Sequence, residues 1–384
     1  MRCPEGATIT ARELNRATLG RQLLLGREPL GAPDALRRVV AVQAQHAASP
    51  YLALWNRLAD FDPADLDAAF AERKLVKATL MRFTLHVVHP DDHPAMHSAM
   101  QPTLRSRMGD PRFARSGLSA AEADALVPDL LAFLAKPRVT AEVEEWFAAR
   151  IELPPKGAWW ALRTFAPVLH APTGDTWSFG QRPAYVAAGA QATPYDRERS
   201  DDALTTLVLR YLAGFGPASA ADVAQFALVQ RARARTAVAA LGDSLERLTG
   251  PDGTELFDVP SGLRPLADTP APPRLMAMWD SVLLAHADRG RVIPPDYRPL
   301  VTRSNGDVLP TLLVDGQVAG VWRPVDGGIE ATAFHRLPAE VWAGLAAEAE
   351  ALTALLADRE PTVYRRFRHW WAALPSAEVR VLPG

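Results

Sequence analysis

The chain of 384 residues and 41.7 kDa is long enough for two or three compact domains, and its 48% hydrophobic and 22% charged residues are typical of a soluble globular protein. The formal net charge of -2 excludes a globally basic nucleic-acid-binding protein, although it does not exclude a basic stripe on one face. The single Cys3 excludes an internal disulfide framework and any multi-cysteine metal site, and no leader-like segment or bilayer-length apolar run is present, so we expect a cytoplasmic protein.

The first segment, residues 8–117, is predicted to be a winged-helix unit. Its helices begin at residues typical of capping boxes, or of a cap followed by proline, namely Thr10 with Glu13, Ser49 with Pro50, and Asp62 with Pro63. The first of these helices is expected to run to about Leu25, and a further helix opens at Asp34. The apolar alternation over residues 80–88 predicts a strand that forms one arm of the wing.

Two further segments repeat this layout of helices followed by a β-hairpin. Residues 118–200 begin at a capping box of Ser119 and Glu122, contain a helix near residues 156–165, and end in a predicted hairpin of strands 168–171 and 176–180. Residues 201–260 restart a helix at Ser219, and their hairpin, residues 245–259, turns at Pro251-Asp252-Gly253. Three such segments in tandem predict a repeated winged-helix unit.

A proline-rich stretch, residues 260–273, indicates a linker before a C-terminal module at residues 274–384. Strands are predicted in this module at residues 308–314, 317–322 and 329–334, with Asp315-Gly316 as the turn between the first two. A long amphipathic helix is predicted at residues 338–357. The whole chain is therefore predicted to be α+β, with three tandem winged-helix units and a C-terminal mixed α/β module.

Two carboxamides flank one alanine in the motif Gln43-Ala44-Gln45. On a regular helix, residues two apart point about 200° apart, so both amides can face one pocket only where the helix ends or is distorted. Since Ser49-Pro50 restarts a helix just downstream, the helix from Asp34 is expected to end between the motif and Ser49. The alternative is structural, with Gln43 as a polar residue on that helix and Gln45 as the cap of its end.

Carboxamides carry no charge, yet they can hold a water molecule and stabilise a cationic sugar. Breaking an N-glycosidic bond builds positive charge on the deoxyribose, and a guanine alkylated at N7 departs as a neutral base without a general acid. An amide carbonyl can orient the attacking water, while the amide N–H groups fix the geometry. This chemistry predicts a glycosylase that uses water and does not cleave the strand, and a Schiff base from Lys74 or Lys77 stays open as the alternative.

A family resemblance is carried by stretches that lie in order along nearly the whole chain: Val42-Gln43-Ala44-Gln45 with Pro50 and Leu54, Arg82-Phe83-Thr84-Leu85-His86, residues 211–219, Trp279-Asp280 through Arg289, Asn305-Gly306-Asp307, and Val314-Asp315-Gly316 through Arg323. They resemble the AlkZ-type bacterial DNA glycosylases, a winged-helix family that includes self-resistance enzymes for DNA-alkylating antibiotics. The resemblance implies three tandem winged helices around a concave DNA channel, and it assigns catalysis to Gln43 and Gln45.

Family members carry Gln-x-Gln or Gln-x-Asp at the catalytic position. The Gln-x-Gln form in this chain resembles the antibiotic-resistance branch, whereas Gln-x-Asp marks a relative with broader activity on crosslinks and simple N7 adducts. Phe83 departs from the family pattern, in which a small residue, usually glycine, is expected. A phenylalanine there is expected to narrow the pocket and to alter the choice of substrate.

Several basic side chains are expected to contact DNA. Arg82 and His86 occupy positions on one face of the predicted strand, so both are expected to reach the pocket of Gln45. A second group surrounds an apolar stretch at residues 292–295 and is expected to grip the DNA backbone beside the lesion: Arg289, Arg291, Arg298 and Arg303, with Asn305. A solvated loop with scattered arginines is the alternative for this second group.

No cofactor and no metal site are predicted. His89, His93 and His97 repeat every four residues, as metal ligands on one helical face do, but Pro94 is expected to interrupt that helix. No carboxylate regularly shares the face with these histidines, so the repeat is not expected to bind an ion.

The expected partner is double-stranded DNA carrying alkylated guanine, bound by a monomer away from any membrane. A tandem winged-helix transcriptional regulator without catalytic activity is the alternative, and it predicts a dimer with a base-reading recognition helix. The helix that starts at Pro50 is largely apolar and poorly suited to reading base edges. A protein that sequesters the alkylating agent is a third class, and it would release no base.

Overall fold

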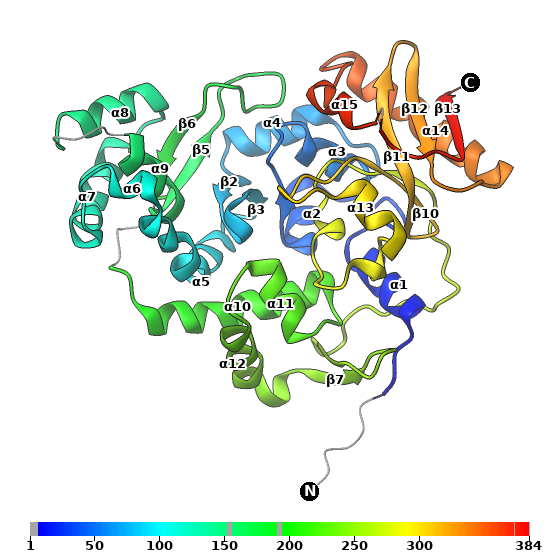
Figure 1. The fold of residues 1–384 in the computed structure, drawn as a ribbon, viewed down its shortest axis with the longest axis horizontal. Coiled ribbons are helices and arrows are strands. Elements are labelled where there is room, and N and C mark those ends of the chain that lie inside the picture. The colour runs from blue at the N-terminus through cyan, green and yellow to red at the C-terminus, as the bar shows by residue number, and fades with distance from the viewer. Residues whose placement is uncertain (1–6, 152–155, 190–193, 372, 384) are drawn as a thin grey trace, which may run out of the picture.

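The computed structural model describes residues 7–151, 156–189, 194–371 and 373–383. Over these residues the chain is a mixture of helices and antiparallel sheets, as the sequence predicts (Figure 1). Residues 111–187 form the left lobe in Figure 1, residues 197–258 form the lower lobe, and residues 11–71 lie with residues 274–371 in the right lobe. None of the described helices is long and apolar enough to span a membrane.

The first segment folds into helices followed by a short hairpin: α1 (Ala11–Arg21), α2 (Ala32–Val39), β1 (Val42–Gln43), α3 (Ser49–Trp55), α4 (Pro63–Ala71), β2 (Val76–Thr79) and β3 (Leu85–Val88). The capping box of Thr10 and Glu13 is confirmed. The helix ends at Arg21 rather than Leu25, since the backbone turns at Leu23, where φ is 56°. The strand predicted over residues 80–88 is wrong in its first half, because residues 81–83 form a 3₁₀ turn between β2 and β3.

The left lobe, with the helix that leads into it, contains α5 (His93–Arg105), α6 (Pro111–Ala114), α7 (Ala120–Phe133), β4 (Arg138–Val139), α8 (Thr140–Ala148), α9 (Lys156–Phe165), β5 (Val168–Ala171) and β6 (Ala184–Ala187). Helices α5 and α6 precede residue 118, so they belong to the predicted first segment, and the other elements belong to the second. The capping box of Ser119 and Glu122 is confirmed. The strand predicted at residues 176–180 is wrong, since β5 pairs with β6 instead. Residues 176–180 leave the lobe because Trp177 packs on Tyr51, 4.9 Å between ring centres, and is buried there.

One six-stranded sheet joins the first two segments, with strand order β1-β3-β2-β5-β6-β4. The junction is the antiparallel pair of β2 and β5, in which Lys77 lies opposite His170. The hairpins of the two segments therefore meet edge to edge, so each covers an edge that the other would leave open.

The lower lobe contains α10 (Arg197–Phe215), α11 (Ala220–Ala227), α12 (Arg231–Leu241), β7 (Glu246–Thr249) and β8 (Glu255–Asp258). Ser219 caps α11 together with Asp222, and the predicted hairpin of residues 245–259 is confirmed as β7 and β8. Its turn contains Gly253 in the left-handed region, with φ of 80°, and Asp252 accepts a hydrogen bond from Thr254 N at 3.1 Å.

The C-terminal module is an antiparallel sheet with strand order β13-β12-β11-β10-β9, flanked by helices. Its elements are β9 (Arg274–Leu275), α13 (Arg298–Val301), β10 (Thr311–Val314), β11 (Gln317–Val325), β12 (Gly328–Ala333), α14 (Ala339–Ala357), α15 (Arg368–Trp371) and β13 (Glu378–Leu382). The predicted strands, the turn at Asp315-Gly316 and the long helix are all confirmed to within a few residues.

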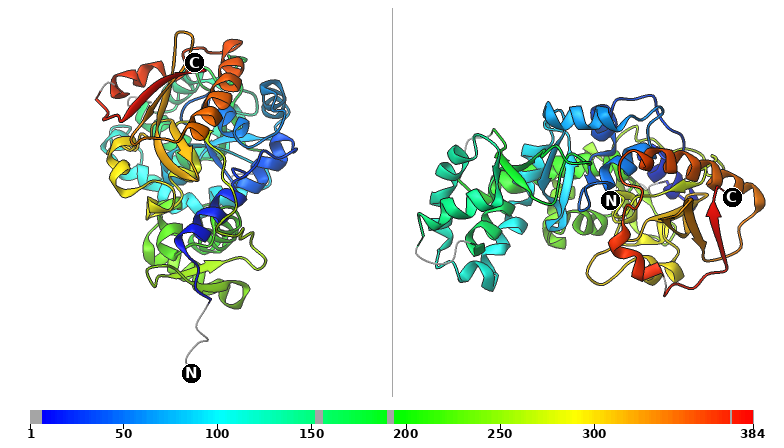
Figure 2. Two further views of the ribbon diagram at one scale, coloured as in Figure 1. Left: turned by 90° about the vertical axis from the view of Figure 1, so that its right-hand side faces the viewer. Right: turned by 90° about the horizontal axis from the view of Figure 1, so that it is seen from above.

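Buried apolar side chains divide into two main cores that do not follow the order of the sequence. Helices α1 to α4 share one core with the C-terminal sheet, where Tyr51, Trp279 and Trp322 belong to the same cluster. Helices α5 to α12 form the second core with β5 and β6. Helices α1 to α4 and the C-terminal module therefore stabilise each other, and Figure 2 shows the blue helices beside the yellow and orange elements of that module.

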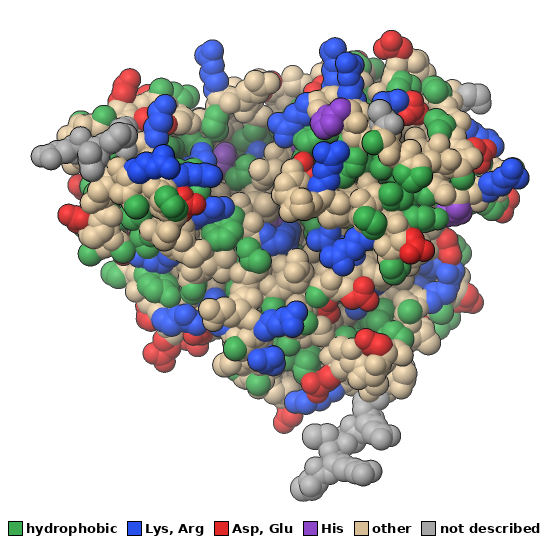
Figure 3. All heavy atoms as spheres, viewed as in Figure 1, with side chains coloured by type: hydrophobic (Ala, Val, Ile, Leu, Met, Phe, Trp, Pro, Cys, Tyr) green, Lys and Arg blue, Asp and Glu red, His purple; other side chains and the backbone are tan. Residues whose placement is uncertain are grey.

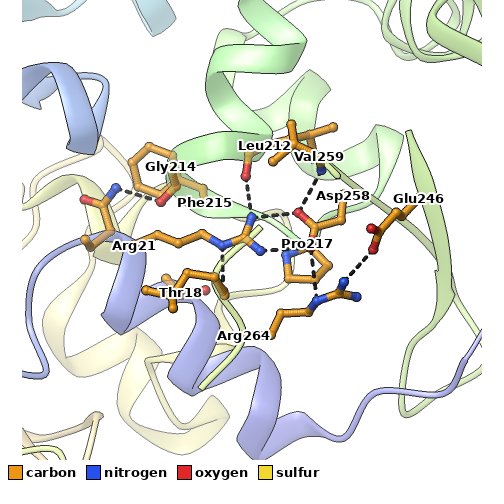
Figure 4. Close-up of polar contacts among 12 residues, drawn as sticks. Thr18, Arg21, Leu212, Gly214, Phe215, Pro217, Glu246, Asp258, Val259 and Arg264 are labelled. Atoms are coloured by element: carbon orange, nitrogen blue, oxygen red, sulfur yellow. Dashed lines mark hydrogen bonds and ion pairs between the residues drawn. The ribbon is translucent and has the colours of Figure 1, made fainter. Parts of the chain in front are cut away.

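Buried ion pairs connect the first segment to distant parts of the chain. Arg21 at the end of α1 contacts Asp258 of β8 at 2.7 Å, with side chains 2% and 0% exposed, and it also donates to the carbonyl of Leu212 (Figure 4). Arg57 and Asp280 form a second pair at 2.7 Å, and both side chains are fully buried. Removing one partner of such a pair leaves an uncompensated charge in a low dielectric.

We predict that Asp258→Asn lowers the free energy of unfolding by about 3–5 kcal/mol, because Arg21 would stay buried without its counter-charge. Urea denaturation monitored by tryptophan fluorescence measures the change. Glu255→Gln on the same strand is the matched control, since the Glu255 pair with Arg247 is more than half exposed and is expected to contribute less than about 1 kcal/mol. Equal losses in the two variants would contradict the role given to the buried pair.

Candidate active site

Gln43 lies on a strand and Gln45 in the bend that follows it, so neither amide is on a helix. The expectation that the helix from Asp34 runs into this motif is wrong, since α2 ends at Val39 and Val40 turns the chain with φ of 76°. Gln43 belongs to β1, and Ala44 N continues the ladder by donating to Leu85 O at 2.7 Å. The helix distortion required by the sequence argument is therefore not needed, because the helix has ended before the motif begins.

The two amides differ in burial and in what holds them. Gln43 is only 4% exposed, whereas Gln45 is exposed. The side-chain oxygen of Gln45 accepts a hydrogen bond from the backbone N–H of Leu85 at 3.3 Å. It thereby takes the place of a backbone carbonyl as the partner of this strand residue. The side-chain oxygen of Gln43 accepts from Arg82 Nη2 at 3.1 Å. Each amide oxygen keeps a second lone pair, and neither amide nitrogen has a hydrogen-bond partner among the described residues.

Arg82 connects the motif to the lower lobe. It lies in the 3₁₀ turn before β3 rather than on the strand, as its φ of 56° shows, so the expectation that it alternates with His86 along one strand is wrong. Its Nη1 donates to the carbonyl of Phe226 in α11 at 2.6 Å, and its Nη2 reaches Gln43. Burial and the nearby Arg289 lower the pKa of Arg82 to about 10, so the side chain remains a cation at neutral pH.

His86 lies opposite Gln43 in the register of β1 and β3, and it is fully buried. Burial, and then the charge of Arg82, lower the pKa of His86 to about 3, so the imidazole is neutral. Its Nδ1 lies 3.0 Å from Thr84 O, which favours the tautomer with the proton on Nδ1 and leaves Nε2 as an acceptor 3.4 Å from Arg82 Nη2. His86 therefore touches the guanidinium rather than the surface.

Arg289, Arg303 and Asn305 of the second basic group have different surroundings in the structure. Arg289 is half-buried, close enough to Arg82 to lower its pKa, and donates to Thr302 Oγ1 at 3.3 Å. Arg303 is exposed and lies over the ring of Trp370 at 3.9 Å, while Asn305 is exposed and donates to Asp307 at 2.9 Å. Within the described part of the chain, no carboxylate lies within 4 Å of the guanidinium of Arg82, Arg289 or Arg303.

Arg291 was expected to contact DNA, but its guanidinium points to other parts of the protein. Its Nη1 donates to the carbonyl of Pro217 at 2.8 Å, and it also reaches Phe215 O at 3.4 Å and Thr18 Oγ1 at 3.3 Å. The guanidinium is thereby occupied by bonds that join α1 to the loop after α10. In this conformation its part in the protein is structural.

Residues far along the sequence complete the surroundings of the motif. His46 packs edge-on against the ring of Tyr364, with 4.9 Å between ring centres. Burial, followed by the charges of Arg366 and Lys77, lowers the pKa of His46 to about 4. These partners were not predicted, although the run of four aromatic and three arginine residues at positions 364–371 is a signal that could have drawn attention to this segment.

The histidine repeat does not form a metal site in the described residues, where no group of three or more His, Cys, Asp or Glu side chains could hold an ion. Helix α5 begins at His93, so His89 lies before it, and Pro94 stands in the first turn rather than interrupting the helix. His93 and His97 stack on each other with 5.6 Å between ring centres.

The sequence profile of the family described as "DNA glycosylase AlkZ-like" matches residues 36–355, which include both glutamines, Arg82 and Arg289. The chain belongs to the AlkZ-like DNA glycosylase family. It is therefore a DNA glycosylase, a hydrolase that acts on N-glycosyl bonds.

Two proteins from Streptomyces sahachiroi are similar to this chain, one in sequence and one in solved structure. A protein described as "Interstrand DNA cross-link repair glycosylase" is 27% identical over 339 residues, which cover 83% of this chain and 90% of that protein. The solved structure described as "DNA glycosylase AlkZ" superposes with a TM-score of 0.75 at 24% identity and covers 90% of this chain and 96% of the other. The second similarity establishes the fold.

We predict that the glycosylase loses stability steeply as the pH falls below about 6.5, in part through His86. The folded chain holds the pKa of His86 near 3, whereas the unfolded chain restores about 6.5, so acid protonates only the unfolded state in this window. His86 therefore stabilises the fold above about pH 6.5, and that contribution is lost as the pH falls towards 3.

His86→Gln is expected to flatten this dependence by about 1.4 kcal/mol per pH unit between pH 6 and pH 4, because one fewer proton is taken up on unfolding. Urea unfolding at a series of pH values measures the slope. The exposed His369→Gln serves as the control. A slope in His86→Gln identical to that of the wild type would show that His86 is protonated in the folded protein.

Proposed function

We infer that this glycosylase hydrolyses the N-glycosidic bond of N7-alkylguanine in duplex DNA, with bulky adducts and interstrand crosslinks as its substrates. The observation that carries this proposal is the pair of amides at Gln43 and Gln45, one at the end of β1 and held by Arg82, the other in the bend that follows and held by the N–H of Leu85. The description of the Streptomyces relative as a crosslink repair enzyme supports the assignment of crosslinks. The physiological role would be DNA repair and self-resistance towards an alkylating natural product.

Water is the proposed nucleophile, so the enzyme would be monofunctional and would leave an abasic site. The free lone pair of an amide oxygen accepts a hydrogen bond from the attacking water and orients it, the proton is released to solvent once the C–O bond has formed, and the amide dipoles lie beside the sugar cation as it forms. A guanine alkylated at N7 is already cationic, and it therefore leaves as a neutral base. The neutral His86 and the uncharged amides are suited to a reaction that needs orientation rather than strong acid.

Arg82 itself would repel a developing sugar cation, so its charge needs a counter-charge during the reaction. No carboxylate supplies one within 4 Å among the described residues, and the same is true of Arg289. A DNA phosphate bound by these two arginines would neutralise them. We therefore assign Arg82 and Arg289 to the DNA backbone beside the lesion, with Arg303 and Asn305 further out, and His86 to the positioning of Arg82.

The DNA duplex is proposed to lie in the hollow between the left and right lobes, where Figure 3 shows Lys and Arg side chains around a recessed surface. In this proposal residues 8–117, 118–200 and 201–260 are three tandem winged-helix units that surround the channel, and residues 274–384 form the additional module. The residues assigned to the site all come from one chain, so a monomer is the proposed active form.

We predict that the double variant Gln43→Ala, Gln45→Ala abolishes base release from duplex DNA carrying N7-methylguanine or a bulky N7-guanine adduct, while duplex binding stays nearly intact. Single-turnover assays of the released base measure the first effect, and fluorescence anisotropy with labelled duplex measures the second. Base release that survives the double change would refute the amide mechanism. Tight binding of undamaged duplex without release by the wild-type protein would favour a regulator instead.

Arg289→Ala is expected to weaken binding of every duplex to a similar extent and to reduce the slope of log K against log salt concentration by about 1. The reason is that one phosphate contact fewer releases one counter-ion fewer. Arg303→Ala tests the outer position in the same way. Arg247→Ala, which removes an exposed cation paired with Glu255 on the lower hairpin, is the matched control. A salt slope unchanged in Arg289→Ala would remove Arg289 from the DNA interface.

A further inference from the structure

Phe83 follows Arg82 in the same strained turn. Their φ values are 57° and 56°, in the left-handed region that a bulky residue adopts only at a cost in free energy. Local hydrogen bonds hold the turn, since the backbone N–H and the hydroxyl of Thr84 both donate to Met81 O at 3.0 Å. The bonds of Arg82 to Gln43 and Phe226 account for the first strained residue. The ring of Phe83 has a different set of neighbours.

A row of rings and guanidinium groups begins at Phe83. The guanidinium of Arg107 lies over the Phe83 ring at 4.2 Å and over the Trp160 ring of α9 at 4.8 Å. Arg112 lies over the same Trp160 ring at 4.9 Å. The row therefore alternates ring, cation, ring and cation, and it leads from the turn beside Gln43 into the left lobe.

The row is open to solvent, and Arg107, the cation between the two rings, has no carboxylate partner in the described part of the chain, whereas Arg112 lies 3.9 Å from Asp110. Phe83, Arg107 and Trp160 are all half-buried, so part of each remains accessible. No carboxylate among the described residues lies within 4 Å of Arg107, and its buried Nε has no hydrogen-bond partner there. Aromatic faces and guanidinium planes attract planar π systems, whereas a small alkyl group gains little from them.

We propose that Phe83, Arg107 and Trp160 form a stacking site for a planar aromatic group carried by the N7 adduct, so that Phe83 makes the enzyme favour aromatic adducts over simple alkyl ones. This inference rests on the proposed function, since it places the damaged guanine at Gln43 and Gln45. Arg82 links the two sites: it bonds to Gln43, and Phe83 is the next residue, so a substituent on the guanine would extend along the row.

A second stack on the same lobe provides a matched control. Phe133 and Trp146 stack with 5.8 Å between ring centres, and each carries its own arginine, Arg138 at 4.7 Å and Arg150 at 4.1 Å. Phe133 is half-buried like Phe83, but it lies on α7 and has no link to the turn of Arg82. Phe133→Leu therefore removes a comparable cation–π contact without touching the proposed stacking site.

The test compares single-turnover base release from two duplexes, one with N7-methylguanine and one with guanine alkylated at N7 by a polycyclic aromatic epoxide. Phe83→Leu keeps an apolar side chain at the same φ but removes the ring. It is expected to lower the release rate of the aromatic adduct about tenfold and to leave that of N7-methylguanine unchanged. Phe83→Tyr, which keeps the ring, and Phe133→Leu are expected to behave like the wild type on both duplexes.

Thermal unfolding of each variant separates a folding defect from a change in selectivity, because only the ratio of the two rates reports on stacking. An equal loss on both duplexes would overturn the assignment to the adduct and would place an unstacked DNA base on the row. An unchanged ratio without loss would overturn the stacking site altogether. If the wild-type protein releases neither base, the proposed function fails, and this inference fails with it.

Discussion

The contact of Arg82 with Gln43 is the constraint on which the proposed site depends. A strained turn presents one buried guanidinium to an amide of the first segment and to the Phe226 carbonyl of the lower lobe, so a single side chain fixes the amide relative to both. His86 must stay neutral beside that cation, which its burial ensures. In the proposed function a DNA phosphate neutralises this charge, which would couple DNA binding to the chemistry proposed for the two amides.

Such a site needs a stiff frame, because a hydrogen bond weakens steeply when its partners shift. The frame comes from the ends of the chain, which share one apolar core, and from buried pairs such as Arg21 with Asp258. The loop before β6 adds a bridge between lobes, where Trp177 Nε1 donates to Glu360 at 2.6 Å. The lobes around the hollow are thereby held together by contacts between residues distant in sequence.

The sequence predicted features that depend on a few neighbouring residues. The capping boxes at Thr10 and Ser119 and the Asp315-Gly316 turn are confirmed, because a cap or a tight turn is completed within four residues. The strand predicted at residues 176–180 was wrong, since the burial of Trp177 against Tyr51 outweighed the strand preference of the local sequence. The predicted position of Arg82 was also wrong, because hydrogen bonds from Thr84 to Met81 O close a turn there, and the partners of Arg82, Gln43 and the Phe226 carbonyl, are not its neighbours in sequence.

By itself, the sequence determined the family, the mixed α+β class and the pair of glutamines, since each follows from residue identity or short-range pattern. Only the tertiary structure decided how those residues are used. It placed Gln43 on a strand and Gln45 in the bend after it, turned Arg82 towards Gln43, occupied Arg291 with backbone carbonyls and brought Tyr364 against His46. One of these contacts, that of His46 with Tyr364, joins residues more than three hundred positions apart, and burial and charge select such partners in space, where no local pattern records them.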